Sequence, residues 1–428
     1  MKNNTLLYLS VFFLINTFTI NAEPVSIDIF LKTAFNDSIV IKQKESIKES
    51  QKILNDIPVI DDLEFRIQNK SWDIQNDKYT IRVGINGLGE THAKQSFIKK
   101  QIAQNEQRVK KTYNSAIKER YDCVIDMLEQ QAFLMLKKNL ILVYEDRVKV
   151  LESRKNSEDF DLNDLIDAEH SLSKLQSEKF EIQKLINILQ KKVVLLSGMN
   201  SVNEFDTTDL IPADSVIAIV KRSIFTVDSN NVHLMGIQRE FELARSRYKL
   251  EKAENRRYIN YVEFAYDNGN MRDELSRKDI GKSYNTNKAY SVEVGLSIPG
   301  FKANALDISK RQESFLKAQI EYEELKRELQ VIMNDDLEDI YSYIGQYQYL
   351  RARETQVDAE ASLKKYLQIT GTDPLVLLSI KEGLIKNSIK IQEVRFGILR
   401  NYINVLDVSG KLSNMPIANY LSNKEGEL

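Results

Sequence analysis

Residues 290–300 read YSVEVGLSIPG, an alternating stretch that ends in Pro-Gly and leads directly into a long helical pattern. Residues 79–89 read YTIRVGINGLG, so a similar junction occurs near the start of the chain. Aligning the two tyrosines gives an offset of 211 positions, and the Ser-Gly pairs at 197–198 and 409–410 keep an offset of 212. Two sets of landmarks, more than a hundred residues apart, thus recur with nearly the same offset, which indicates that the chain is a duplication of one unit.

Each predicted unit has the order helix, strand, strand, long helix, turn, helix. In the first unit we expect helices near 26–54, 91–155 and 162–196 and strands near 62–72 and 78–86. In the second we expect helices near 213–254, 301–368 and 375–411 and strands near 259–267 and 288–297. The predicted divisions are a leader at 1–22, a first repeat at 23–211, a second repeat at 212–412 and a tail at 413–428. A helix of about 65 residues is roughly 100 Å long, which suits a tube or a coiled coil better than a compact globule.

The start of the chain has the pattern of a secretory signal peptide. Lys2 precedes the apolar run LLYLSVFFLI at 6–15, and Ala22 supplies a small residue at a cleavage position. A retained N-terminal anchor is the alternative. Cys123 is the single cysteine, so no internal disulfide is expected, and its place within a helix predicts a packed core residue.

The composition argues against several classes of function. A net charge of −2 gives no electrostatic reason to expect a nucleic-acid partner. The three histidines lack metal-ligand spacing, and neither a nucleotide-binding loop nor a catalytic motif is present. The sequence therefore predicts a protein that is not an enzyme and that binds no cofactor and no metal.

The predicted strands carry one apolar and one charged face. The apolar face, which would contact lipid in a barrel, includes Phe65, Ile81, Val83, Phe264, Val292 and Val294. The opposite face, which would line a lumen, includes Glu64, Arg66, Arg82 and Glu293. Such alternation is typical of a transmembrane β-barrel and also of a half-buried soluble sheet. The export signal and the aromatic residues near strand ends favour the barrel.

Four strands are too few to close a membrane barrel, since known barrels start at about eight strands. Open edges in lipid would leave backbone N–H and C=O groups without partners. A barrel built from this chain must therefore be shared between copies in outer membrane lipid. Three copies would give twelve strands, and this homotrimer is our prediction, although a tetramer also satisfies the count.

Taken together, the duplicated unit, the junction at 292–301 (VEVGLSIPGF), the Ser-Gly pairs and the turn at 370–384 (TGTDPLVLLSIKEGL) resemble the TolC-like outer membrane efflux proteins of Gram-negative bacteria. The resemblance covers essentially the whole mature chain. It implies a mainly α-helical chain with a membrane β-barrel, assembled as a trimeric channel-tunnel whose helices lie in the periplasm. It also implies a periplasmic adaptor protein and, through it, an inner-membrane pump as partners.

Two features depart from the family pattern. The first junction lacks the proline of the second, so its bend must come from Gly87 and Gly89. The first tip, NSEDFDLNDLIDAEH, lacks the glycine that Gly371 supplies in the second tip.

The resemblance places the closed end of the tube at the helix tips. The predicted gate and tip residues are the acidic Asp161, Asp164, Asp167 and Asp373, together with Leu377 and Ile380, which depart from the family pattern because they occupy places where acids form a gate ring in some members. Acidic residues at a helix start also complement the helix dipole, and Asp161 is a candidate N-cap for that reason. The adaptor contacts it implies are Asn156, Ser157, Phe160, Thr370, Gly371 and Thr372, with a tight turn as the alternative for the Gly-Thr pair.

The function that follows is a passive outer membrane conduit for drug efflux or for type I secretion, opened at its periplasmic tip. A periplasmic coiled-coil adaptor, or a structural rod without a pore, is the alternative from a different class.

Overall fold

In the computed structural model, the described residues are 24–55, 60–69, 77–87, 89–157, 160–228, 230–267, 289–296, 305–356, 373–412 and 418–423. The predicted leader, the second-tip residues Thr370, Gly371 and Thr372, and most of the predicted tail lie outside these ranges.

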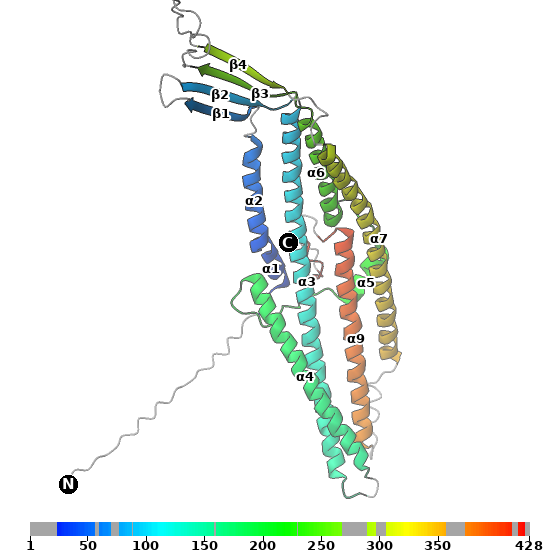
Figure 1. Ribbon diagram of the computed structural model, residues 1–428. Coiled ribbons are helices and arrows are strands. Elements are labelled where there is room, and N and C mark those ends of the chain that lie inside the picture. Colours follow the sequence, from blue (N-terminus) through cyan, green and yellow to red (C-terminus); the bar gives the residue numbers. More distant parts are fainter. Residues whose placement is uncertain are drawn as a thin grey trace, which may run out of the picture.

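The chain is mainly helical, with one small antiparallel sheet at an end of the molecule from which the long helices extend (Figure 1). The first half contains α1 (Ile27–Lys32), the 3-10 turn η1 (Thr33–Asn36), α2 (Ser38–Asn55), β1 (Ile60–Asn69), β2 (Asp77–Ile85), α3 (Glu90–Ser153) and α4 (Leu162–Ser197). The second half contains α5 (Ala213–Arg222), α6 (Val232–Glu254), β3 (Ile259–Asp267), β4 (Ala289–Leu296), α7 (Ala305–Gln356) and α9 (Pro374–Ser409). None of the described helices has an apolar stretch long enough to cross a bilayer.

The sheet has the order β1-β2-β3-β4, and all of its pairings are antiparallel. The first hairpin therefore pairs directly with the second, through β2 and β3. The register shifts near the start of β1, between Ile60 and Asp62, and near the start of β3, between Ile259 and Tyr261. Strands β1 and β4 form the two edges of the sheet. Along each strand, apolar and polar residues alternate as the sequence predicted.

Two of the predicted helices are interrupted, and the first of them is the helix expected over 26–54. A 3-10 turn separates α1 from α2, and Asp37 takes an extended conformation between them with ψ near 130°. The Asp37 carboxylate accepts a hydrogen bond from the Ile39 N–H at 3.1 Å, so it caps the start of the second helix. An N-cap residue cannot continue the preceding helix, because its backbone leaves the helical conformation.

The helix expected over 213–254 is also interrupted, between α5 and α6. Ser223 ends α5 in an extended conformation, and Asn231 caps α6 by accepting from the N–H groups of His233 and Leu234. The Asn231 amide also donates to the Val408 carbonyl at 2.7 Å. The interruption is therefore fixed by a contact with the end of α9, far away in sequence.

Helix α3 forms the centre of the helical part and contacts α4, α6 and α9 (Figure 1). Its 64 residues would span roughly 96 Å. The largest core cluster surrounds the middle of α3, where Val124 packs with Ile398 and Ile403 of α9 among fully buried side chains. Cys123 lies in this core, as predicted, and burial raises the pKa of its thiol to about 11.

A buried arginine ties the N-terminal segment to this core. Only 1% of the Arg120 side chain is exposed. Its guanidinium donates to the Thr33 hydroxyl at 2.9 Å and to the Leu196 carbonyl at 2.8 Å, and it lies 3.5 Å from the Asp37 carboxylate. Arg120 therefore satisfies a carbonyl at the end of α4 while fixing the cap that begins α2.

The two Ser-Gly pairs lie at the C-terminal ends of α4 and α9. Gly198 follows α4 with φ 70°, and Gly410 follows α9 with φ 83°. This left-handed conformation is common at helix C-termini and is accessible to glycine at little cost. The pairs seen in the sequence are therefore helix stop signals.

Candidate functional site

The tip of the first helical hairpin lies at the end of the molecule opposite the sheet (Figure 1). A turn at 154–157 follows α3, in which the Ser157 N–H donates to the Arg154 carbonyl at 2.9 Å. Asp161 then begins α4 by accepting from the Asn163 N–H at 2.8 Å, which confirms its predicted role as an N-cap. Asn156 and Ser157 are exposed on this turn.

The start of α9 lies beside the same turn. Asp373 caps α9 by accepting from the Leu375 N–H at 2.9 Å, and Pro374 occupies the first helical position as expected. The Arg154 guanidinium donates to both Asp373 oxygens, at 2.6 and 3.2 Å. These bonds from Arg154, followed by the capping bond, lower the pKa of the Asp373 carboxyl. One ion pair thus joins the ends of α3 and α9.

A second polar contact joins α3 and α9 further along the helices. Glu382 accepts from the Tyr144 hydroxyl at 2.7 Å and pairs with Arg147 at 2.9 Å and with Lys386 at 2.6 Å. Arg147 also donates to the Ser379 hydroxyl at 2.8 Å. Burial alone would raise the pKa of Glu382, but the bonds from Lys386 and Tyr144 and the charge of Arg147 lower it overall. Glu382 is therefore an ionised centre shared by the two helices.

Between these contacts lies a cavity of about 290 Å³ that opens among α3, α4 and α9. Asp164 and Asp167 contribute to its α4 side, and Arg147 and Ser379 contribute from the other two helices. Both aspartates are exposed. The structure thus brings two of the predicted acidic tip residues to one cavity that an arginine also lines.

A small apolar cluster supports the tip from within. Leu151, Leu165 and Ala168 are buried, and Val148, Phe160 and Leu375 pack against them. Phe160, a predicted adaptor contact, is therefore partly buried in this cluster. Leu377 and Ile380, predicted for an apolar part of the gate, are half-buried on α9.

The polar ties between α3 and α9 were not predicted from the sequence. Tyr144 and Arg147 occur at helical spacing on α3, and Arg154 follows at the C-cap of that helix, while Ser379, Glu382 and Lys386 occur at helical spacing on α9. That spacing indicates that the residues of each set lie on one face of their own helix. It does not say that the two faces meet, because the partners are more than 200 positions apart.

The sheet forms the other predicted site, and its apolar face is open in the single chain. The register places four of the predicted lipid-face residues in one row across the strands: Phe65, Ile81, Phe264 and Val292. Their exposed fractions are 60%, 45%, 53% and 64%, respectively. Val83 and Val294 belong to the next apolar row, in which Val294 is 48% exposed and Val83 is half-buried. A sheet face with this much open apolar surface requires a covering, and the described residues of the chain do not supply it.

The opposite face of the sheet carries the predicted lumen residues, three of them in ion pairs and Glu293 in a hydrogen bond. Arg66 donates to Glu64 at 2.6 Å, and Arg82 lies 3.5 Å from Glu263. Glu293 accepts a hydrogen bond from the Tyr261 hydroxyl at 2.7 Å. The two faces therefore differ in chemistry as the sequence predicted, with Glu263 and Tyr261 added to the charged side.

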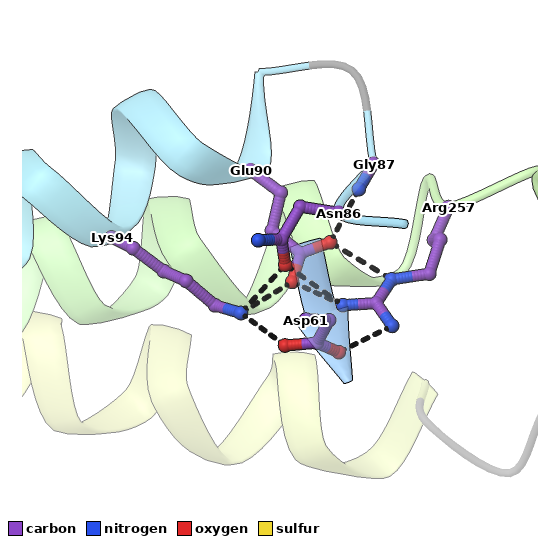
Figure 2. A network of polar contacts seen from close by, with 6 residues as sticks. All are labelled: Asp61, Asn86, Gly87, Glu90, Lys94 and Arg257. Carbon is purple, nitrogen blue, oxygen red and sulfur yellow. Dashed lines mark hydrogen bonds and ion pairs between the residues drawn. The ribbon is translucent and has the colours of Figure 1, made fainter. Parts of the chain in front are cut away.

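A polar network joins the sheet to the helices at the first junction (Figure 2). Gly89 precedes α3 with φ 81°, so the backbone turns there through a conformation that favours glycine. The Gly87 N–H donates to the fully buried Glu90 carboxylate at 2.8 Å. Glu90 also accepts from Arg257, between α6 and β3, at 2.9 Å and from Lys94 at 2.9 Å. The first junction, which lacks the proline, therefore contains the hydrogen-bonded carboxylate of Glu90.

Asp61 of β1 completes the network. It pairs with Arg257 at 2.8 Å and with Lys94 at 3.1 Å, so two cations share two carboxylates (Figure 2). Burial would raise the pKa of Glu90, but the hydrogen bonds from Arg257, Gly87 and Lys94 lower it overall. The network connects β1, the end of β2, the start of α3 and the entry to β3. It therefore fixes the direction in which the helices leave the sheet.

Among the described residues, no group of histidine, cysteine and acidic side chains is arranged to hold a metal ion.

No protein family and no curated protein matches this sequence. Solved structures do match its fold. The outer membrane protein VceC from Vibrio cholerae matches with a TM-score of 0.65 at 13% identity, over 90% of this chain and 96% of that one. The CmeC outer membrane channel of Campylobacter jejuni matches at 0.64 and 9% identity, over 90% and 85% of the two chains. The open state of the MtrE outer membrane channel of Neisseria gonorrhoeae matches at 0.64 and 9% identity, over 90% and 88%. The fold of this chain is that of the TolC-like outer membrane channels, as the sequence resemblance predicted.

Proposed function

We propose that the protein is an outer membrane channel-tunnel that conducts small molecules or secreted polypeptides out of a Gram-negative cell. In this proposal the sheet forms part of a β-barrel in the outer membrane, and the helices form a tube in the periplasm. A periplasmic adaptor and an inner-membrane pump act as partners and supply the energy. The observation that carries the proposal is the sheet, which is apolar and open on one face and charged on the other, and whose edge strands β1 and β4 pair with no further strand in the part of the chain that the structure describes.

The two sheet edges support an assembly of several copies. Backbone groups along β1 and β4 must be paired before the sheet can enter hydrocarbon, and an edge from another copy pairs them in an antiparallel ring. A homotrimer would give twelve strands, which lies within the known range of barrel sizes that begins at about eight strands.

The helical flanks support the same assembly. Helix α4 lies along one flank of the protomer and α7 along the other (Figure 1). Both expose large apolar side chains, including Phe180 and Leu195 on α4 (67% and 82% exposed) and Leu306 and Ile320 on α7 (63% and 57%). Contact between unlike flanks of neighbouring copies would cover these side chains in a closed ring.

The tip contacts support opening at the periplasmic end. The Arg154–Asp373 pair and the Glu382 centre are the polar ties that join α3 to α9 at the tip. The Arg154–Asp373 pair is half-exposed, and such a pair contributes little energy, so a docked adaptor could replace it at small cost. Asn156, Ser157 and Phe160 of the first tip, with Thr370, Gly371 and Thr372 of the second, are the proposed contacts for that adaptor.

The acidic residues Asp161, Asp164, Asp167 and Asp373, together with Leu377 and Ile380, are the proposed gate. Symmetry would repeat the cavity aspartates around the tube, and a ring of carboxylates favours cations. A periplasmic rod without a pore is the competing function, and it would have no use for a sheet with an open apolar face.

Single-channel conductance of the purified protein in a planar bilayer tests the proposal. We expect small openings in the wild type that millimolar divalent cations block, and larger or unblocked openings in Asp164→Ala. Asp146→Ala, an exposed aspartate on α3, is the matched control, and its openings should equal those of the wild type.

If the wild type and Asp164→Ala show the same openings, the proposal of a channel is retained and the proposal of an acidic gate is rejected. Well-folded assemblies that never conduct would reject the channel in favour of the rod.

A further inference from the structure

The charged face of the sheet contains a row that crosses all four strands. The register pairs Glu64 with Arg82, Arg82 with Glu263, and Glu263 with Glu293. Each strand therefore contributes one charged residue at the same level. The row holds three carboxylates and one guanidinium.

The aromatic ring of Tyr261 organises this row. The Arg82 guanidinium stacks on that ring, 3.6 Å from its centroid, and the Tyr261 hydroxyl donates to Glu293. The ring lies directly over Gly295 of β4, since a Cβ at that glycine would come within 2.3 Å of a ring carbon. Glycine at position 295 thus makes the space in which Tyr261 lies flat and reaches across to Glu293.

The carboxylates differ in how their charge is balanced. Glu64 pairs with Arg66, and Glu263 pairs with Arg82. Glu293 accepts only the neutral Tyr261 hydroxyl, and no cation among the described residues lies within ion-pair distance of it. Glu293 is also exposed. Within the described part of this row, Glu293 is therefore the positioned carboxylate whose charge no cation compensates.

We propose that Glu293, held by Tyr261, gives the conduit a preference for cations at the level of the sheet. This inference rests on the proposed function, in which the charged face lines the lumen. In a closed ring of copies the uncompensated carboxylates recur at one height, and such rings of charge set the selectivity of pores. Glu293 is then a specificity-determining residue, and positively charged solutes are the class it favours.

The reversal potential of single channels across a potassium chloride gradient measures this preference directly. In Glu293→Gln, we expect the ratio of potassium to chloride permeability to fall roughly two- to threefold, because one charge per copy is lost. In Arg82→Gln, the ratio should rise, because a positive charge leaves the same row. Glu293→Asp, which conserves the charge, should restore most of the wild-type ratio.

The predicted changes have opposite signs, so a general disturbance of the sheet cannot produce both. A permeability ratio in Glu293→Gln equal to that of the conducting wild type would overturn this inference and leave the channel proposal standing. Absence of any conductance in folded wild-type protein would overturn both.

Discussion

Replacing Glu90 with glutamine should weaken the connection between the sheet and the helices. The Glu90 side chain is fully buried and accepts hydrogen bonds from Arg257, Lys94 and the Gly87 N–H. Hydrogen bonds to a charged group contribute about 1.5–3 kcal/mol each, against about 0.5–1.5 kcal/mol for neutral groups. Glutamine has the same shape as glutamate but no charge. Its NH2 group is a donor in place of one acceptor oxygen, so it faces one of the cationic donors without forming a hydrogen bond.

Asp61 limits the loss, because it remains as a counter-charge for both Arg257 and Lys94. We therefore expect the free energy of unfolding to fall by about 2–3 kcal/mol, less than the upper range for breaking a fully buried ion pair. In a double-mutant cycle with Arg257→Gln, the coupling energy should be at least about 1 kcal/mol.

The assay is chemical denaturation of the detergent-solubilised protein, followed by circular dichroism at equal protein concentrations. Glu106→Gln is the matched control, because Glu106 is an exposed glutamate on the same helix, and its effect should stay within about 0.5 kcal/mol. A loss below about 0.5 kcal/mol in Glu90→Gln, or a coupling energy near zero, would refute the account of the junction.

The difference in stability between the wild type and Glu90→Gln should also depend on pH. The pKa of Glu90 is lowered in the folded state, below its ordinary value of 4.5, so its contribution to stability is present above that value. As the pH falls through the folded-state pKa, Glu90 becomes protonated and the contribution is lost. The stability difference between wild type and Glu90→Gln should therefore shrink in acid, and a constant difference would contradict this reasoning.

Three further substitutions test other parts of the fold. Arg120→Met should lower the free energy of unfolding by about 3 kcal/mol, since the Leu196 carbonyl loses a buried donor; denaturation would show this, and a neutral result would contradict it. Glu382→Gln should increase cleavage by added protease near the helix tips, because the tie between α3 and α9 is weakened; unchanged digestion would argue against that tie. Gly410→Ala should cost about 1–3 kcal/mol, because φ there is 83° and a Cβ would lie 2.8 Å from the Asn231 Cα; a melting temperature equal to that of the wild type would reject this strain.

The strands were predictable because their signal is local. In residues 79–85, apolar side chains alternate with polar ones, and this period of two appears wherever one sheet face differs from the other. The predicted bounds of β2, β3 and β4 agree with the structure to within one residue at each end. Asp161 and Pro374 were predictable for the same reason, since capping and first-turn preferences depend on a few neighbouring residues.

The helix interruptions were not predictable, because their causes are distant in sequence. Asp37 and Asn231 both resemble ordinary polar residues within a helical pattern. Asp37 contacts Arg120 of α3, and Asn231 donates to the carbonyl of Val408 in α9. These tertiary contacts favour a cap over helix continuation, and helix propensity alone is too weak to oppose them.

The tip shows the same limit. Asp373 was a predicted tip residue, but its pairing with Arg154 joins positions more than 200 residues apart. The sequence predicted no role for Glu382, because a glutamate on a charged helix is ordinary. Its importance arises only when Tyr144 and Arg147 approach from another helix.

The pairing of β2 with β3 has a consequence for biogenesis. It joins segments about 180 residues apart along the chain, whereas each hairpin and each helix can form from nearby residues. Both halves of the chain must therefore be present before the four strands can meet, whereas the helices can form first. Under the proposed function, β1 and β4 then still need partner strands from other copies. We expect assembly in the aqueous compartment to precede or accompany entry into lipid, with single chains needing protection by chaperones during transit.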